Sequence, residues 1–196
     1  MSALLAVLAA LLLSSVALPN QAFARGRGQA CVFLAPKGAG GFGHVGWAFQ
    51  EPPSDHWFFG ATEGAGGEEG GPNARKIPPG QRNGAWVDTG NWRKVLDTFR
   101  NAKANEHPGG YYKQYTCADA NQSAVHSAAV QAQANIGRGY NLFGDNCMNH
   151  AYDVLHAYNL TLPSPNEPIY VSPTWAPNLW VNKLSRTPGW NGLNSL

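Results

Sequence analysis

The chain has few charged residues and little net charge. Asp, Glu, Lys and Arg make up 13% of its 196 residues, and the formal net charge is +2. No cluster of Lys or Arg stands out. Proteins that bind nucleic acid need such clusters to neutralise phosphates, so nucleic acid is not an expected partner. The 23 glycines and 7 tryptophans are typical instead of a loop-rich globular domain with aromatic surfaces.

Long apolar runs are absent except at the start of the chain. The run within residues 1–24 is short for a membrane span of about 20 residues, and Ala22-Phe23-Ala24 has the form of a signal-peptide cleavage site. A single membrane anchor is the alternative. We expect residues 1–24 to be a signal peptide and the mature protein to be secreted, either extracellular or periplasmic, without stable membrane insertion.

The remaining length is enough for one domain with its own core. We expect a single catalytic domain over residues 25–162. Residues 163–196 are rich in Pro, Asn and Trp and are predicted to form a C-terminal tail that packs on this domain. The protein is expected to be a monomer.

Cysteine is scarce as well, with Cys31, Cys117 and Cys147 as the complete set. In an oxidising compartment an odd number leaves one thiol unpaired. The most economical arrangement pairs Cys31 with Cys117 and leaves Cys147 free. An intermolecular bridge or three free thiols are the alternatives.

The spacing of apolar residues predicts an α+β fold, with a small antiparallel sheet packed against the helix that bears Cys147. Strict alternation indicates strands, and a 3.6-residue period indicates helices. The expected strands lie at 29–35, 44–49, 56–62, 84–88 and 111–117, with 44–62 as a hairpin. The expected helices lie at 91–103, 121–136, 147–158 and 178–184. The Gly-rich segment 64–71 is expected to be a surface loop.

Cys147 begins one of these predicted helices. Asp145 or Asn146 can cap the helix by accepting hydrogen bonds from its free backbone N–H groups. A thiol on the first turn feels the positive end of the helix dipole and can lose its proton near neutral pH, as a cysteine nucleophile requires. The alternative is a small buried hydrophobic residue without chemistry.

A cysteine nucleophile also needs a base, which is usually a histidine. His44 is the favoured candidate because it opens a predicted strand. The other residues on its face of that strand are Gly46 and Ala48, whose small size would let the Cys147 helix approach. His150 lies on the Cys147 helix itself, and a base there cannot easily reach a sulfur on the first turn of its own helix.

His44-Val-Gly-Trp-Ala on a hairpin, followed by Asp145-Asn146-Cys147 at the start of a helix, resembles the circularly permuted papain-like superfamily. Its members include the permuted NlpC/P60 hydrolases, with lecithin:retinol acyltransferase-like and PPPDE-type proteins as relatives. In these proteins the histidine strand precedes the cysteine helix. The similarity covers roughly residues 29–160. The chain departs from the acyltransferase-like pattern around the cysteine, where it reads Asn-Cys-Met-Asn-His.

The resemblance implies a third polar residue that orients His44, and two positions compete for this role. His56 follows His44 by twelve residues, a spacing that the acyltransferase-like members share. If residues 52–55 form the hairpin turn, Glu63 lies beside His44, and His56 lies on the order of 20 Å away along the ribbon. A wider bulge or a slipped register would favour His56 instead.

The implied reaction is attack by the Cys147 thiolate on a carbonyl carbon, followed by hydrolysis of the acyl-enzyme, with the backbone N–H of Cys147 placed to help hold the oxyanion. The expected substrate is an amide bond in a peptide, with the stem peptides of peptidoglycan as the substrate that the family suggests. A lipid thioesterase or acyltransferase is one alternative, and a non-catalytic secreted binding protein is another. No cofactor is expected, and no metal, since Cys147, His150 and Asp153 would crowd its ligands onto one helix.

Overall fold

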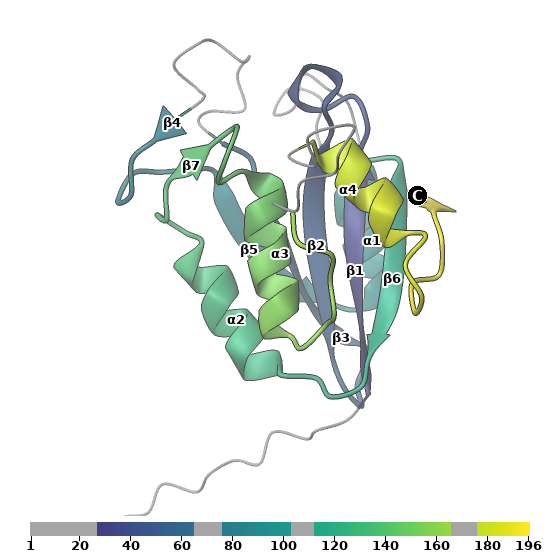
Figure 1. The fold of residues 1–196 in the computed structure, drawn as a ribbon. Helices are drawn as coiled ribbons and strands as arrows, with labels where there is room; N and C mark the ends of the chain where they lie inside the picture. Colours follow the sequence, from purple (N-terminus) through teal and green to yellow (C-terminus); the bar gives the residue numbers. More distant parts are fainter. Residues whose placement is uncertain (1–26, 65–75, 103–111, 166–175) are drawn as a thin grey trace, which may run out of the picture.

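The computed structural model describes residues 27–64, 76–102, 112–165 and 176–196 (Figure 1). The predicted signal peptide at 1–24 and all but the first residue of the predicted loop at 64–71 lie outside these described residues. Within the described residues, no helix is long and apolar enough to cross a membrane.

A six-stranded sheet forms the centre of the fold, with strand order β5-β3-β2-β1-β6-β8. Every pair of neighbouring strands in it is antiparallel. The strands are β1 (Gly28–Ala35), β2 (His44–Glu51), β3 (His56–Thr62), β5 (Ala85–Gly90), β6 (Gln114–Ala120) and β8 (Asn194–Ser195). A separate pair joins β4 (Lys76–Ile77) to β7 (Tyr140–Asn141). The α+β class is confirmed, although the sheet is larger than predicted.

Helices cover both faces of the sheet, so the molecule has two hydrophobic clusters (Figure 1). Residues of α2, α3 and α4 contribute to the cluster on one face, and residues of α1 contribute to the cluster on the other. The helices are α1 (Trp92–Arg100), α2 (Val125–Ala134), α3 (Cys147–Ala157) and α4 (Pro177–Leu184), with a short 3-10 turn η1 (Ala39–Gly41) before β2. All four predicted helices are present, with the first two shorter than predicted.

One expectation about the packing is wrong. The small-residue face of β2 does not receive α3, because a Cβ at Gly46 would lie 2.4 Å from the ring of Phe99 on α1. Helix α3 packs instead on the opposite face, where Val45, Trp47 and Phe49 share its hydrophobic cluster. Alternation along β2 separated the two faces correctly, but it could not indicate which helix each face would meet.

A disulfide joins Cys31 to Cys117, on the neighbouring central strands β1 and β6. The two cysteines lie directly opposite each other in the antiparallel register. Cys147 is the free cysteine and is buried. The predicted pairing is therefore confirmed, and it is compatible with an oxidising compartment.

The C-terminal segment packs onto the sheet and its helices. Trp180 of α4 is fully buried, and its indole N–H donates to the carbonyl oxygen of Pro163 at 3.0 Å. Strand β8 then adds an edge to the main sheet by pairing with β6. The tail is thus part of the folded domain, and α4 lies close to the loop that precedes β2, since Asn178 N–H donates to Phe42 O at 3.0 Å.

Candidate active site

The first turn of α3 holds Cys147 in a fixed position. The side chain of Asn146 caps the helix by accepting from the N–H of Met148 at 2.9 Å. The side chain of Asn149 reaches back and accepts from the N–H of Asn146 at 3.1 Å, which completes a capping box. Of the two predicted caps, Asn146 is therefore the one used. The Cys147 thiol lies at the positive end of the helix dipole and is only 3% exposed.

His44 and Glu63 meet beside this thiol because of the hairpin register. Glu51 pairs with His56 and Gly46 with Ala61, so continuing the register by two places puts Glu63 opposite His44. The Oε2 atom of Glu63 lies 2.5 Å from Nε2 of His44, and both side chains are nearly buried. The His44 side chain is also hydrogen-bonded to that of Cys147. Since Nε2 faces Glu63, Nδ1 is the ring nitrogen left for the thiol.

The charges around His44 favour its protonated form. Burial alone would lower the pKa of the imidazole, but the negative charges of Glu63 and Cys147 and their hydrogen bonds outweigh it. The pKa of His44 is therefore raised well above its usual value of 6.5. An imidazolium at neutral pH is the state that stabilises a neighbouring thiolate.

Two tyrosines that the sequence did not single out also surround the thiol. The hydroxyl of Tyr140 is hydrogen-bonded to the side chain of Cys147 and accepts from the backbone N–H of the same residue. The ring of Tyr112 lies 5.8 Å from that of His44, and its buried hydroxyl has no hydrogen-bond partner among the described residues. Burial and the charges of Glu63 and Cys147 raise the pKa of both phenols well above 10, so both hydroxyls are neutral.

Tyr140 therefore occupies the N–H that we expected to hold an oxyanion, and a substrate carbonyl oxygen has to compete with it there. The position of Tyr140 at the start of the Tyr-Asn-Leu-Phe-Gly-Asp-Asn-Cys stretch is a signal in the sequence that could have pointed to it. Tyr112 carries no comparable local signal, because its approach to His44 depends on how β6 pairs with β1.

His56, the other candidate for the third position, lies at the far end of β3. Its Nδ1 atom is 2.8 Å from Oε2 of Glu51, and its side chain is 40% exposed. At about 3.3 Å per residue, the difference of seven positions between His56 and Glu63 corresponds to a separation on the order of 20 Å. The structure brings together Cys147, His44 and Glu63, and it does not bring His56 to them.

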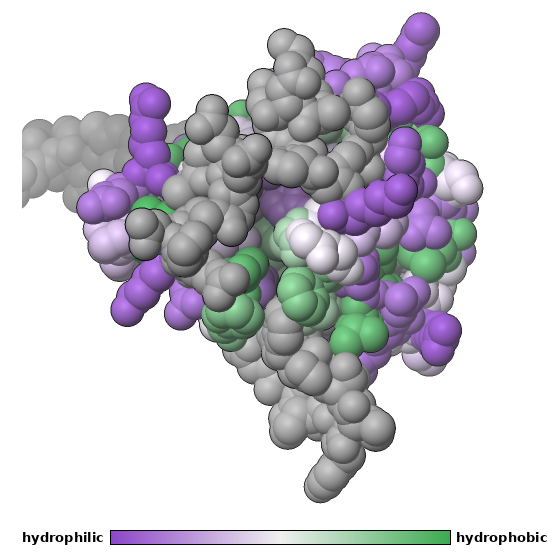
Figure 2. Space-filling model, turned by 90° about the horizontal axis from the view of Figure 1, so that it is seen from above, coloured by the Kyte–Doolittle hydropathy of each residue, from purple (hydrophilic) through white to green (hydrophobic). Residues whose placement is uncertain are grey.

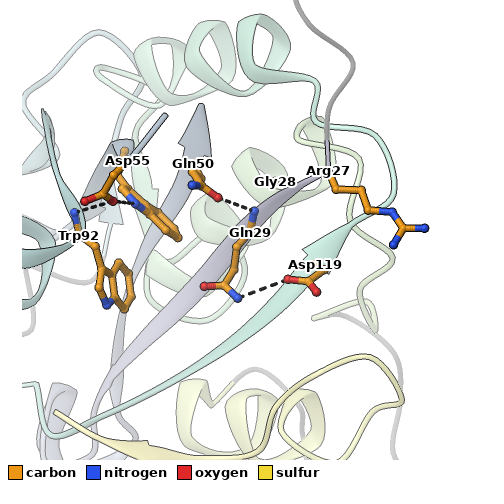
Figure 3. Close-up of a pocket in the computed structure, with 8 residues that line it drawn as sticks. Arg27, Gly28, Gln29, Gln50, Asp55, Trp92 and Asp119 are labelled. Atoms are coloured by element: carbon orange, nitrogen blue, oxygen red, sulfur yellow. Dashed lines mark hydrogen bonds between the residues drawn. The ribbon is translucent and has the colours of Figure 1, made fainter. Parts of the chain in front are cut away.

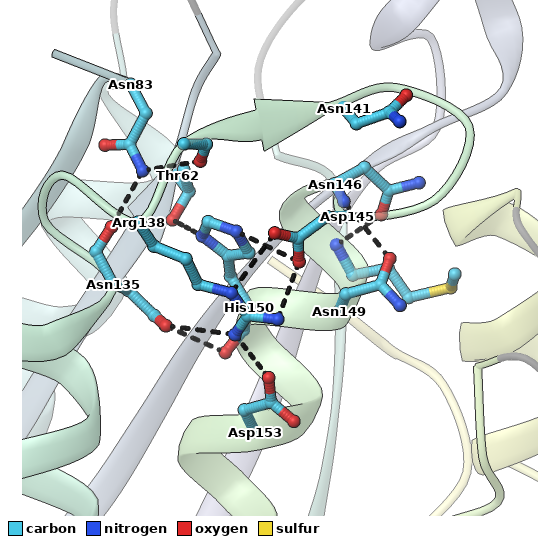
Figure 4. Close-up of polar contacts among 12 residues, drawn as sticks. Thr62, Asn83, Asn135, Arg138, Asn141, Asp145, Asn146, Asn149, His150 and Asp153 are labelled. Atoms are coloured by element: carbon cyan, nitrogen blue, oxygen red, sulfur yellow. Dashed lines mark hydrogen bonds and ion pairs between the residues drawn. The ribbon is translucent and has the colours of Figure 1, made fainter. Parts of the chain in front are cut away.

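His150 is fully buried and belongs to a polar network with Thr62 and Asp145 at the start of α3 (Figure 4). Its ring lies between Thr62 and Asp145, and the side chain of Asp153 is bound by Arg138. The three residues considered above for a metal are thus directed at different partners. Among the described residues, no group of three or more His, Cys, Asp or Glu side chains is arranged to hold a metal ion.

A narrow apolar slot opens beside the Cys147 sulfur. It is narrow, because the centre of a water molecule fits into only about 10 Å³ of it. Its lining residues are Ala39, Phe42, Gly43, Tyr140, Leu142, Asn146, Cys147 and Pro177. In the view onto this end of the molecule, hydrophobic side chains gather beside a hollow (Figure 2). The slot has room for roughly one small group beside the thiol.

A larger concavity, of about 490 Å³, lies at the opposite end of the sheet (Figure 3). Its polar side chains bind one another: Gln29 donates to Asp119 at 3.3 Å, and Asp55 accepts from the indole N–H of Trp57 at 2.9 Å. No histidine or cysteine lines it. We therefore place the candidate active site at the smaller slot, which Cys147 lines, and not at the larger concavity.

Comparison of the chain with models of protein families, with curated proteins and with solved structures returned no match. The fold and the site define the protein by themselves as an α+β domain with a Cys–His–Glu cluster at one end of an antiparallel sheet.

Proposed function

We propose that this protein is a secreted cysteine hydrolase that cleaves an amide bond through Cys147 and His44. The observation that carries the proposal is the arrangement of three side chains. A thiol at a helix N-terminus is hydrogen-bonded to a buried histidine, and that histidine is in turn paired with a buried glutamate at 2.5 Å. This is the nucleophile, base and orienting group that acyl transfer requires. The order of the histidine strand and the cysteine helix is also that of the permuted papain-like proteins that the sequence resembles.

The chemistry follows from the positions of these groups. The Cys147 thiolate attacks the carbonyl carbon of the amide, and the negative charge moves to the carbonyl oxygen. When the C–N bond breaks, the His44 imidazolium gives its proton to the leaving amine, and a thioester remains on Cys147. Neutral His44 then takes a proton from a water molecule, which attacks the thioester; the C–S bond breaks, the carboxylic acid leaves, and the Cys147 thiolate and the His44 imidazolium are restored. Glu63 holds the imidazole in place and stabilises its charged form throughout.

The reactivity of the thiol tests this proposal directly. Because the other two cysteines form the disulfide, Cys147 is the one thiol that iodoacetamide can alkylate in the folded protein. At pH 6 an ordinary thiol is less than about 1% ionised, so we expect Cys147 to react on the order of 10²-fold faster than free N-acetylcysteine. The rate is measured by intact-mass spectrometry, with Cys147→Ala as the unlabelled control.

A Cys147 thiol that stays unmodified in the folded protein would contradict the proposal. It would favour the alternative in which the domain is a binding protein without catalytic activity. Labelling that appears only after denaturation would lead to the same conclusion, since burial alone would then govern access to the thiol.

A thioesterase or acyltransferase is the second candidate, and the apolar lining of the slot is the observation that favours it. Phe42, Leu142 and Pro177 offer no hydrogen-bonding side chain to a substrate group inserted beside Cys147. The small volume of the slot limits the size of that group to a few carbon atoms. The observations therefore favour a small apolar group next to the scissile carbonyl, as in a peptide, over the long acyl chain of a lipid.

Acyl-chain selectivity separates the two candidates. We expect the kcat/KM for p-nitrophenyl esters to fall by about tenfold or more between acetate and octanoate. The short acyl group already fills the slot, so there is no room for each further methylene of a longer chain. Leu142→Ala, which enlarges the slot, is expected to reduce that difference, whereas Leu193→Ala, at an exposed residue that does not line the slot, should not. A kcat/KM that rises with chain length would instead support the lipid enzyme.

A further inference from the structure

The proposed catalytic groups come from two separate parts of the chain, and their geometry depends on how these parts are held together. Glu63 follows directly after the last residue of β3, and Cys147 is the first residue of α3. A shift of α3 along the sheet would separate the thiol from the imidazole without unfolding either element. Something must therefore lock the end of β3 to the start of α3.

His150 is the side chain that bridges these two points (Figure 4). Its Nδ1 atom lies 3.0 Å from the hydroxyl oxygen of Thr62, the residue immediately before Glu63. Its Nε2 atom lies 3.4 Å from a carboxylate oxygen of Asp145, two residues before Cys147. His150 and Thr62 are almost completely buried, at 0% and 2% exposure, whereas the Asp145 side chain is 32% exposed.

The Asp145 side chain is itself held in place by an ion pair with Arg138. Arg138 binds both carboxylate oxygens of Asp145, through Nη2 at 2.6 Å and Nε at 3.2 Å. The same guanidinium also binds Asp153 of α3, eight residues after Asp145. Burial alone would raise the pKa of Asp145, but its contacts with His150 and Arg138 outweigh it and lower the pKa below 3.8. Asp145 is therefore an ionised acceptor.

The backbone around His150 is fixed as well. The side chain of Asn135, at the end of α2, donates to the carbonyl oxygen of His150 at 3.0 Å. Asn83, before β5, donates to the carbonyl oxygens of Asn135 and Gly139 at 2.7 and 2.9 Å. These contacts leave the imidazole little freedom to turn away from its two partners. The ring is therefore held between a hydrogen bond from Nδ1 to the Thr62 hydroxyl and an ion-pair contact from Nε2 to Asp145.

We propose that His150 is a positioning residue, which sets the distance between Cys147 and the His44–Glu63 pair by tying the end of β3 to the start of α3. The inference rests on the proposed function, because it assigns His150 to the geometry of that same site. His150 takes no part in bond making or breaking. Its ring nitrogens contact Thr62 and Asp145.

The isosteric variant Thr62→Val tests this bridge with the least disturbance, because it removes only the hydroxyl that meets Nδ1. The readout is the pH dependence of iodoacetamide alkylation of Cys147 in the full chain. We expect the midpoint of the rate curve to rise by about half to one pH unit, so that the rate at pH 6 falls by about three- to tenfold. The maximal rate at high pH should stay the same, since the fully ionised thiol reacts equally in both proteins.

Thr116→Val is the matched control. Thr116 is a fully buried threonine on β6 of the same sheet, and its hydroxyl meets only a distant Asn191 at 3.5 Å. Both variants lose one buried hydroxyl, so a general loss of stability affects them alike and leaves the pH midpoint unchanged. A second pair of variants tests whether a conservative replacement restores the effect. His150→Gln keeps a donor that can reach Asp145, so we expect it to recover part of the alkylation rate that His150→Leu loses.

Two outcomes overturn the inference, and they differ in what else they overturn. If Thr62→Val and Thr116→Val give the same midpoint as the unaltered protein, His150 has no positioning role, although the proposed function stands. If the unaltered protein itself shows a midpoint near that of an ordinary thiol, about pH 8.5, the proposed Cys–His pair fails and the positioning role fails with it.

Discussion

Replacement of His44 by alanine is expected to reduce hydrolysis of p-nitrophenyl acetate by about 10³-fold or more in kcat/KM. Its side chain is hydrogen-bonded to that of Cys147 and, in the proposed mechanism, supplies the positive charge that stabilises the thiolate. Without it, the thiol needs bulk solvent to take its proton, and no positioned acid remains for the leaving group. Removing one member of a catalytic group that acts as a unit typically costs 10³- to 10⁶-fold. Stopped-flow detection of p-nitrophenol measures the change.

His56→Ala is the matched control for that experiment. It removes a histidine from the same hairpin, also paired with a glutamate, but from the end remote from Cys147. We expect its kcat/KM to stay within about twofold of the unaltered protein. If His56→Ala were as damaging as His44→Ala, the assignment of the third residue to Glu63 would have to be abandoned.

Glu63→Gln is expected to lower kcat/KM by about 10²-fold at neutral pH and to move the alkaline limit of activity to lower pH. The carboxylate raises the pKa of His44 against the opposing effect of burial. With a neutral amide in its place, less opposes the lowering of the His44 pKa by burial, so the imidazolium loses its proton at a lower pH. Because the leaving amine needs that proton, the rate should begin to fall at a lower pH in the variant. A pH–rate profile from pH 5 to 10 measures the shift.

The same substitution has a defined effect on stability. A histidine whose pKa is raised by folding contributes stability that is fully present below its unfolded value, about pH 6.5, and is lost as the pH rises through the folded value. The loss of Tm in Glu63→Gln should therefore be larger at pH 5.5 than at pH 10. Glu51→Gln, which breaks the exposed pair with His56, serves as the control and should change Tm little at either pH. An equal loss at both pH values would show that Glu63 does not act on the charge of His44.

Much of the local structure could be predicted because it depends on short-range patterns. Alternation of apolar residues indicated strands near β1, β2 and β3, and the sequence between them indicated the hairpin whose register puts Glu63 opposite His44. The capping residues before Cys147 indicated where α3 begins. Counting cysteines made the pairing of Cys31 with Cys117 the most economical one but left alternatives open, and the register of β1 with β6 provides its geometry.

The predictions that were wrong concern contacts between parts of the chain that are far apart in the sequence. The face of β2 with Gly46 and Ala48 was assigned to the Cys147 helix, yet it receives Phe99 of α1. Both helices have an apolar face that could cover a sheet, so composition does not distinguish them. The predicted strand at 111–117 begins at Gln114 instead, and Tyr112 lies just before it, beside His44. That placement depends on strand pairing across the sheet, which local alternation does not encode.

The sequence by itself determined the chemistry that is available: a thiol on a capped helix, a histidine at the start of a strand, and two candidates, Glu63 and His56, for the residue that orients it. These follow from periodicity, capping and turn length, all of which act over a few residues. Only the tertiary structure decided that the thiol and the imidazole meet, that two neutral tyrosines surround them, and that His150 joins Thr62 to Asp145. Those contacts join residues up to about a hundred positions apart, and packing of the whole domain brings them together.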